Sequence, residues 1–132
     1  MYLLVTGCSE SYESRYASYG EAEQRGAIKN GWIPENIPKT AVDIVKKHNV
    51  ERRSTIISFA YTGRFRDMLG DDCELADKKN LIWPNISAKW WPQDLNVDYK
   101  ETIDLPYVFY WCNNLEGFYA ISTLTNRAYF WQ

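Results

Sequence analysis

Apolar and polar residues alternate most regularly near the end of the chain. Three short stretches show this alternation, and polar turns separate them: Pro106–Cys112, Gly117–Thr123 and Arg127–Trp131. Such spacing is typical of β-strands that follow one another in an antiparallel meander. Ser54–Tyr61 has the same character and is the natural fourth strand. The pattern therefore predicts a small antiparallel sheet of about four strands.

A helical pattern follows a Tyr- and Ser-rich stretch near the start of the chain. Ser18 and Glu21 have the spacing of a capping box, in which a hydroxyl and a carboxylate satisfy the first free amides of a helix. Gly31 suits the position after a helix end, because glycine adopts the left-handed conformation without penalty. These signals predict a short helix over Glu21–Lys29.

A rigid connection and a second helix are expected next. A glycine, two prolines and an anchoring tryptophan predict a wedge-like connection at Gly31, Trp32, Pro34 and Pro38. After this wedge, four positions fall on one helical face, namely Ala41, Ile44, Val45 and His48. The expected architecture is α+β, with an antiparallel meander of about four strands and two short helices on one face. We expect residues 1–132 to form a single globular domain.

Composition narrows the class of protein without naming a function. Of the 132 residues, 45% are hydrophobic and 24% are charged, which is ordinary for a soluble globular domain. A formal net charge of −2 gives no basic footprint, so we expect no nucleic-acid partner. The aromatic share of 16% is high, and such large side chains either fill a core or form a binding surface. Composition leaves the oligomeric state open.

The three cysteines bear on the compartment in which the protein works. Cys8 follows an apolar run, as at the cleavage end of a bacterial lipoprotein signal, although a complete signal needs a basic segment and a longer apolar core upstream. Residues 1–8 are thus either a signal remnant of a lipidated envelope protein or an N-terminal strand of a cytoplasmic one. Cys73 and Cys112 could form a disulfide in an oxidising compartment, whereas in the cytosol all three would be free thiols.

No combination of residues in the sequence specifies a reaction. His48 is the single histidine, and it could serve as a general base or metal ligand, but its expected position favours a role in closing a helix. The acidic run Asp71–Glu74 lacks the ligand spacing that a hard cation needs. Nucleophile-elbow, dinucleotide and phosphate-loop motifs are missing from the sequence. We therefore expect no enzyme activity, no metal and no cofactor.

Five residues are candidates for binding. Exposed indoles at Trp83, Trp90 and Trp91 could stack on a sugar or on the side chains of a partner. The alternative is that these three side chains fill the open face of the sheet. Arg52 and Arg53 could form a basic recognition point, or they could simply be solvated residues at the start of a strand.

The central segment resembles the YbbD-like family of small bacterial proteins. The resemblance is carried by Tyr12–Ser14, Ala27–Pro34, Ile37–Pro38, Ala41–Ile44 and His48, and by the two segments Phe118–Ile121 and Arg127–Trp131. Many such proteins look like lipoproteins, and some are encoded beside large Rhs-type toxins, where small partner proteins serve as immunity factors. The chain departs from the family pattern at Asn49–Ser54, which replaces a more acidic run.

Three functions remain open from the sequence. The first is a non-catalytic binding protein, either a lipoprotein-like protein of the envelope or an immunity protein that neutralises a toxin by protein–protein contact. The second is a small-ligand or glycan binder that uses the aromatic platform of Trp83, Trp90 and Trp91. The third is a hydrolase that uses His48 with an acidic partner. Membrane attachment is expected only through a lipid at Cys8.

Overall fold

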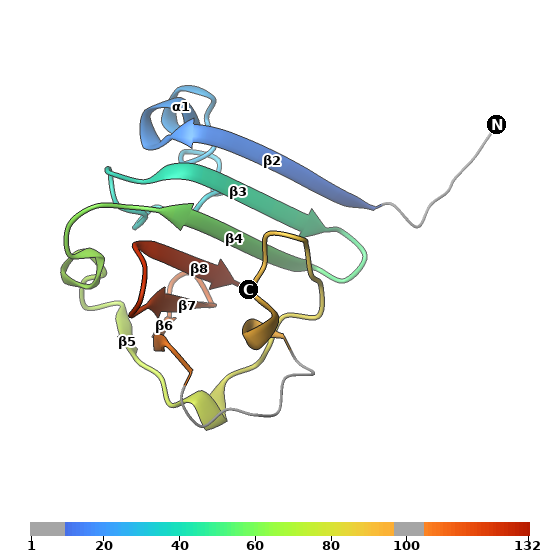
Figure 1. The fold of residues 1–132 in the computed structure, drawn as a ribbon. Coiled ribbons are helices and arrows are strands. Elements are labelled where there is room, and N and C mark those ends of the chain that lie inside the picture. The colour runs from blue at the N-terminus through green and yellow to red at the C-terminus, as the bar shows by residue number, and fades with distance from the viewer. Residues whose placement is uncertain (1–9, 97–104) are drawn as a thin grey trace.

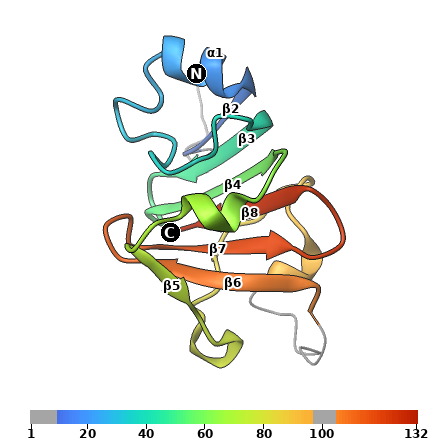
Figure 2. The same ribbon diagram turned by 90° about the vertical axis from the view of Figure 1, so that its left-hand side faces the viewer.

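The computed structural model describes residues 10–96 and 105–132, which fold around one antiparallel sheet of seven strands (Figure 1). The strands are β2 (Ser11–Ser18), β3 (Val42–Asn49), β4 (Ser54–Ala60), β5 (Cys73–Leu75), β6 (Tyr107–Cys112), β7 (Gly117–Ser122) and β8 (Arg127–Trp131). Their order across the sheet is β2-β3-β4-β8-β7-β6-β5, which Figure 2 shows from top to bottom. The described helical elements are short: α1 (Tyr19–Gln24) and three 3₁₀ turns at Phe65–Met68, Lys78–Asn80 and Gln93–Leu95.

The expected α+β class is wrong, because the fold is mostly β. The segment expected to form the second helix is strand β3. A bulge explains the error: the register shifts between Val42 and Val45, and Asp43 between them has a positive φ of 51°. Ile44 and Val45 are both buried, because both faces of the sheet are covered at β3. Two adjacent buried residues do not show the alternation of a strand, so the sequence pattern looked like one face of a helix.

The C-terminal meander was predicted correctly. β6, β7 and β8 follow one another as antiparallel neighbours, and β4 pairs with β8 as the fourth strand. Strands β2 and β5, at the two edges of the sheet, were not expected. The N-terminal strand that was one alternative for residues 1–8 lies outside the described residues.

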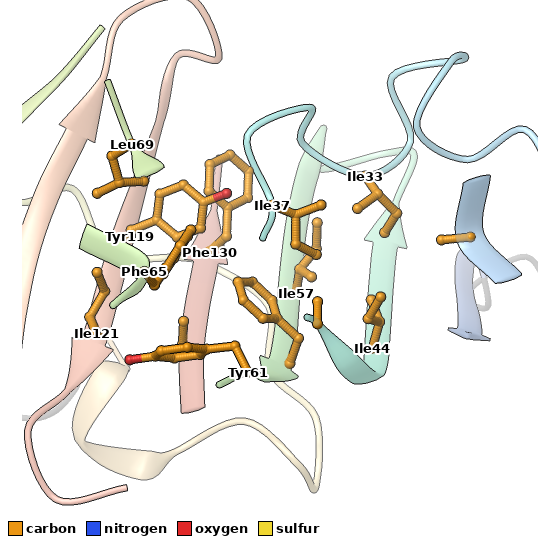
Figure 3. Close-up of a cluster of buried hydrophobic side chains, with 14 of the residues drawn as sticks. Ile33, Ile37, Ile44, Ile57, Tyr61, Phe65, Leu69, Tyr119, Ile121 and Phe130 are labelled. Carbon is orange, nitrogen blue, oxygen red and sulfur yellow. The ribbon is translucent and has the colours of Figure 1, made fainter. Parts of the chain in front are cut away.

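The first face of the sheet is covered by residues 19–41 and 61–70 (Figure 3). Ser18 Oγ accepts a hydrogen bond from the Glu21 amide, as in the predicted capping box, whereas the Glu21 carboxylate accepts its bond from the Ala17 amide, one residue before the cap. The helix ends earlier than expected, at Gln24. The side chains packed on this face include Ile33, Phe59, Phe65 and Phe130, all of them almost fully buried.

The second face of the sheet is covered by residues 76–96, which contain two 3₁₀ turns and no strand. This segment packs through its own side chains, above all Trp91 and Leu95, against residues such as Phe109 and Trp131. The indole nitrogen of Trp131 donates a hydrogen bond to the carbonyl of Ile82 at 2.7 Å. An irregular segment of this length is therefore part of the core and is not a free loop.

A candidate binding cleft on the second face

One row of side chains crosses the second face of the sheet at right angles to the strands. In the strand register, neighbouring members of the row lie directly opposite one another: Ile56, Trp131, Phe118, Trp111 and Glu74. Neighbouring strands are only about 4.8 Å apart, so large side chains in such a row must touch. The ring of Phe118 stacks on Trp131 with centroids 5.5 Å apart, and it meets Trp111 at 4.7 Å.

A cleft of about 280 Å³ opens beside this aromatic row. Its apolar lining includes Trp131, Phe118 and Trp111, together with Trp83 and Ile82 of the covering segment. Trp83 stacks on Trp131 at 6.0 Å with the two rings almost parallel. Ile82 is 75% exposed, although its carbonyl is held by the Trp131 indole. We call this hollow, between the β3–β4 turn, residues 82–85 and the β6–β7 turn, the aromatic cleft.

Two charged residues line the aromatic cleft on strained backbone. Arg53 has a φ of 51° and Glu116 a φ of 50°, and both are exposed. The left-handed conformation costs a residue with a Cβ roughly 1–2 kcal/mol, and such residues concentrate at functional sites. Neither side chain has a hydrogen-bond or ion-pair partner among the residues that the structure describes. An opposite pair of charges is thus presented to solvent beside an apolar floor.

Residues 10–60 match the family model of the YbbD head domain. This part of the chain is therefore YbbD-like, and we refer to residues 10–60 as the head domain. The match spans β2, α1, β3 and β4, and it therefore includes Arg52 and Arg53 at one wall of the aromatic cleft. The aromatic floor of the cleft, formed by residues of β6, β7 and β8, lies outside the matched segment. No curated protein and no solved structure matches the chain.

Three of the five predicted binding residues meet at the aromatic cleft. Arg53 and Trp83 line it as described, and Arg52 lines it as well. Arg52 also has a structural role, since its Nη1 donates a hydrogen bond to the carbonyl of Asn85 at 3.0 Å and so fastens the covering segment to the head domain. Within the pair, Arg53 is therefore the residue whose charge is available to a partner.

The other two predicted binding residues lie elsewhere. Trp91 is 4% exposed and packs edge-on against Trp131, so it is part of the core. Trp90 is half-buried and donates its indole N–H to the carboxylate of Glu13 at 3.0 Å. This hydrogen bond lowers the pKa of Glu13, with a smaller contribution from Arg15. The three tryptophans of the segment therefore do not form one exposed platform.

His48 lies in strand β3 of the head domain and not at a helix end. Its Nδ1 is 2.8 Å from the hydroxyl of Thr55 on β4. The two residues line a more polar hollow of about 440 Å³, which shares Arg53 and Glu116 with the aromatic cleft. Within the described parts of the chain, no group of three His, Cys, Asp or Glu side chains is arranged to hold a metal ion.

The connection at residues 31–38 makes its buried apolar contact through a residue other than the expected Trp32. Gly31 has a positive φ of 73°, and Pro34 and Pro38 are buried. Trp32 is 50% exposed, so the buried apolar contact is made by Ile33. The tryptophan expected to anchor this connection thus faces solvent for half of its surface.

The same connection reaches the disulfide region through a polar contact. Cys73 and Cys112, opposite each other on β5 and β6, form a disulfide in the structure. Asn36 donates to the Cys73 sulfur at 3.4 Å and accepts a hydrogen bond from the Tyr119 hydroxyl at 2.7 Å. Burial raises the pKa of Tyr119, so its hydroxyl is held as a donor. Cys8, the proposed lipidation site, lies outside the described residues.

The aromatic floor of the cleft was not singled out from the sequence. Trp111, Phe118 and Trp131 were recognised as strand residues, yet alternation alone does not say which residues of different strands face one another. The register that aligns them depends on the turns of the meander. Nothing in the sequence marked Glu116 as a binding residue, because it is one of several polar residues in a turn.

Proposed function

We propose that this YbbD-like chain is a non-catalytic binding protein that acts by protein–protein contact through the aromatic cleft. The observation that supports the proposal is the pairing of an open aromatic floor with Arg53 and Glu116 on strained backbone. Tryptophan and arginine are enriched among residues that dominate binding energy at protein interfaces. A cleft of about 280 Å³ has room for one large side chain of a partner.

The partner that fits the family context is a toxin-like protein, which would make the chain a toxin-neutralising immunity protein or a lipoprotein-like protein of the envelope. A binder of this kind acts by covering its partner, and it needs no catalytic groups. None of the described helices is long and apolar enough to cross a membrane. Any membrane attachment in this proposal depends on a lipid at Cys8.

Glycine variants test whether the cleft binds the product of a neighbouring toxin-like gene. Arg53→Gly and Glu116→Gly remove the two charges and keep the backbone conformation, because glycine adopts positive φ without strain. Co-expression with that product should give a complex with the wild type, and the variants should retain much less of it. Asp43→Gly is a control for the backbone change, since Asp43 also has a φ of 51° but lies at the opposite end of β3; it also removes the ion pair of Asp43 with Arg127.

Two results would count against the proposal. If the two glycine variants retain the partner as well as Asp43→Gly does, the cleft is not the binding surface. If no toxin-like protein is encoded beside the chain, or if none is retained by the wild type, the immunity role fails. Thermal unfolding of each variant shows whether a loss of binding comes from a loss of folding.

A glycan is the second candidate ligand, and one observation favours it. Trp83 and Trp111 are both partly exposed at the aromatic cleft, where an indole face could stack on a sugar ring. A glycan array probed with the wild type and with Trp83→Ala tests this alternative. Binding that disappears in the folded variant would favour it, and an empty array would remove it.

A further inference from the structure

A second hollow adjoins the aromatic cleft on the same face of the sheet. It measures about 360 Å³. The residues that line this hollow and not the aromatic cleft belong to β5 and the segment after it, and they include Glu74, Leu75 and Asp77. Ile82, Trp111 and Phe118 line both hollows. The two hollows are therefore the ends of one trough that follows the aromatic row across the strands, and we call it the cross-strand trough.

The two ends of the cross-strand trough carry opposite charge. At the β4 end the charged lining residues are Arg52, Arg53 and Glu116, two positive and one negative, which gives a formal charge of +1. At the β5 end they are Glu74 and Asp77, and because Asp77 is paired with Lys79 at 3.9 Å, the charge left unpaired among the described residues at this end is the −1 of Glu74. Apolar and aromatic side chains lie between these ends. A ligand that follows the trough therefore meets a positive end, an apolar middle and a negative end.

The length of the trough suits a short extended segment of protein. The lining of the trough runs from Ser54 on β4 to Glu74 on β5, which is four steps between neighbouring strands. At about 4.8 Å for each step the trough is about 19 Å long, which is the span of about six residues in an extended chain at about 3.3 Å each. A single sugar ring or side chain would occupy only one of the two hollows.

The walls of the trough leave apolar side chains uncovered. Ile82, between the two hollows, is 75% exposed, and Leu75 at the β5 end is 66% exposed. β5 is an edge strand of three residues that pairs only with β6. Exposed aliphatic residues beside half-buried aromatic ones are typical of surfaces that bind protein partners.

We propose that the cross-strand trough binds an extended segment of about six residues from a partner protein, with an acidic side chain at Arg53, apolar side chains over Trp111 and Phe118, and a basic side chain at Glu74. The proposal rests on the proposed function, because it names the chemistry of the segment that the aromatic cleft receives. It adds the direction of that segment, which the charge difference between the two ends determines.

Selection from a displayed library of short random peptides tests this direction. The immobilised wild-type protein should enrich peptides with an acidic residue at one end, an apolar or aromatic middle and a basic residue at the other end. The charge-reversed variant Arg53→Glu with Glu74→Lys should disfavour these peptides by about tenfold and should enrich peptides of inverted charge. Lys29→Glu with Glu23→Lys is the matched control, because both residues are exposed and lie on the cover of the opposite face.

The possible results separate this proposal from the proposed function. The trough proposal is overturned if the wild type enriches no peptide, if the charge-reversed variant selects the same peptides as the wild type, or if the Lys29 and Glu23 control changes the selection equally. Retention of a toxin-like partner that depends on Arg53, together with any of these results, would leave the proposed function standing and remove only the extended segment. Loss of enrichment in folded Trp111→Leu, with Trp90→Leu unchanged, would support the trough.

Discussion

The two covers of the sheet differ in what they leave exposed. Residues 19–41 and 61–70 close the first face around fully buried side chains such as Ile33, Phe59 and Phe65. Residues 76–96 cover the second face incompletely, and the aromatic row remains partly open at its two hollows. Both faces of the sheet therefore carry a buried core, but only the second keeps open hollows beside it.

The two covers are also fastened differently. On the second face, side chains of the sheet donate hydrogen bonds to carbonyls of the covering segment: Lys47 to Ser87, Arg52 to Asn85 and Trp131 to Ile82. On the first face the contacts are mainly apolar, and the polar ones include the hydrogen bond from Arg25 to the carbonyl of Arg15 and the contact of Asn36 with Tyr119 and the disulfide. Hydrogen bonds to a loop backbone fix its path without requiring that its side chains be buried. This explains how Ile82 can be held in place and yet remain exposed.

The largest difference between the faces should appear when one side chain is removed from each. Phe59 is fully buried and contacts Phe65 and Tyr119 edge-on at 5.5 and 6.5 Å. Phe59→Ala should lower the free energy of unfolding by about 3–5 kcal/mol, because it loses burial and leaves a cavity. Ile82→Ala on the second face should change it by less than about 0.5 kcal/mol. Urea denaturation measures both values, and equal losses would show that the faces do not differ.

The next effect concerns the disulfide, which joins the edge strand β5 to β6. Cys73 and Cys112 are 39 residues apart, so the bridge removes a large loop from the unfolded chain. Cys73→Ser with Cys112→Ser should cost about 2–4 kcal/mol, seen as a lower denaturation midpoint than the oxidised wild type. Reduced wild type should behave like the double variant. A wild type insensitive to reductant would show that the bridge does not contribute.

The sequence predicted the part of the fold that depends on local patterns. Alternating residues in β6, β7 and β8 specify strands by themselves, and the capping box at Ser18 and Glu21 specifies the start of α1. β3 was mistaken for a helix because its bulge and its two covered faces break the alternation. β5 is only three residues long and is defined by its pairing with β6. Such pairings depend on tertiary contacts, which a local sequence pattern does not reveal.

The candidate site was predictable only in its residue types. Arg52, Arg53 and Trp83 were identified because tryptophan and arginine are common at interfaces, and they lie together in the structure. The row of Trp131, Phe118 and Trp111 required the register of two strand pairs, β7 with β8 and β6 with β7. One slip of one residue in any pair would move a ring to the other face. This part of the site therefore became visible only with the fold.

A third prediction concerns the hydrogen bond between Asn36 and Tyr119, which joins the cover of the first face to the sheet. Asn36→Ala removes the acceptor of the Tyr119 hydroxyl, which is fully buried, and should cost about 1–3 kcal/mol. Adding Tyr119→Phe removes the stranded hydroxyl and should restore part of that loss. A double-mutant cycle from urea denaturation measures the coupling. If the double variant is less stable than Asn36→Ala alone, the hydrogen bond is not the reason for the loss.

The smallest effect should come from the outer end of the second cover, where Trp90 donates to the Glu13 carboxylate. This bond is the main cause of the lowered pKa of Glu13, so Trp90→Phe should raise that pKa towards its ordinary value, as an NMR titration of Glu13 would show. A carboxyl whose pKa is lowered by folding contributes stability above its unfolded pKa and loses it as the pH falls through the folded one. Because Glu13 retains 42% of its side-chain exposure, this contribution is screened and should not exceed a few tenths of a kcal/mol. The variant should therefore lose slightly less stability on acidification than the wild type does, and an unchanged Glu13 titration would show that the indole does not hold this carboxylate in solution.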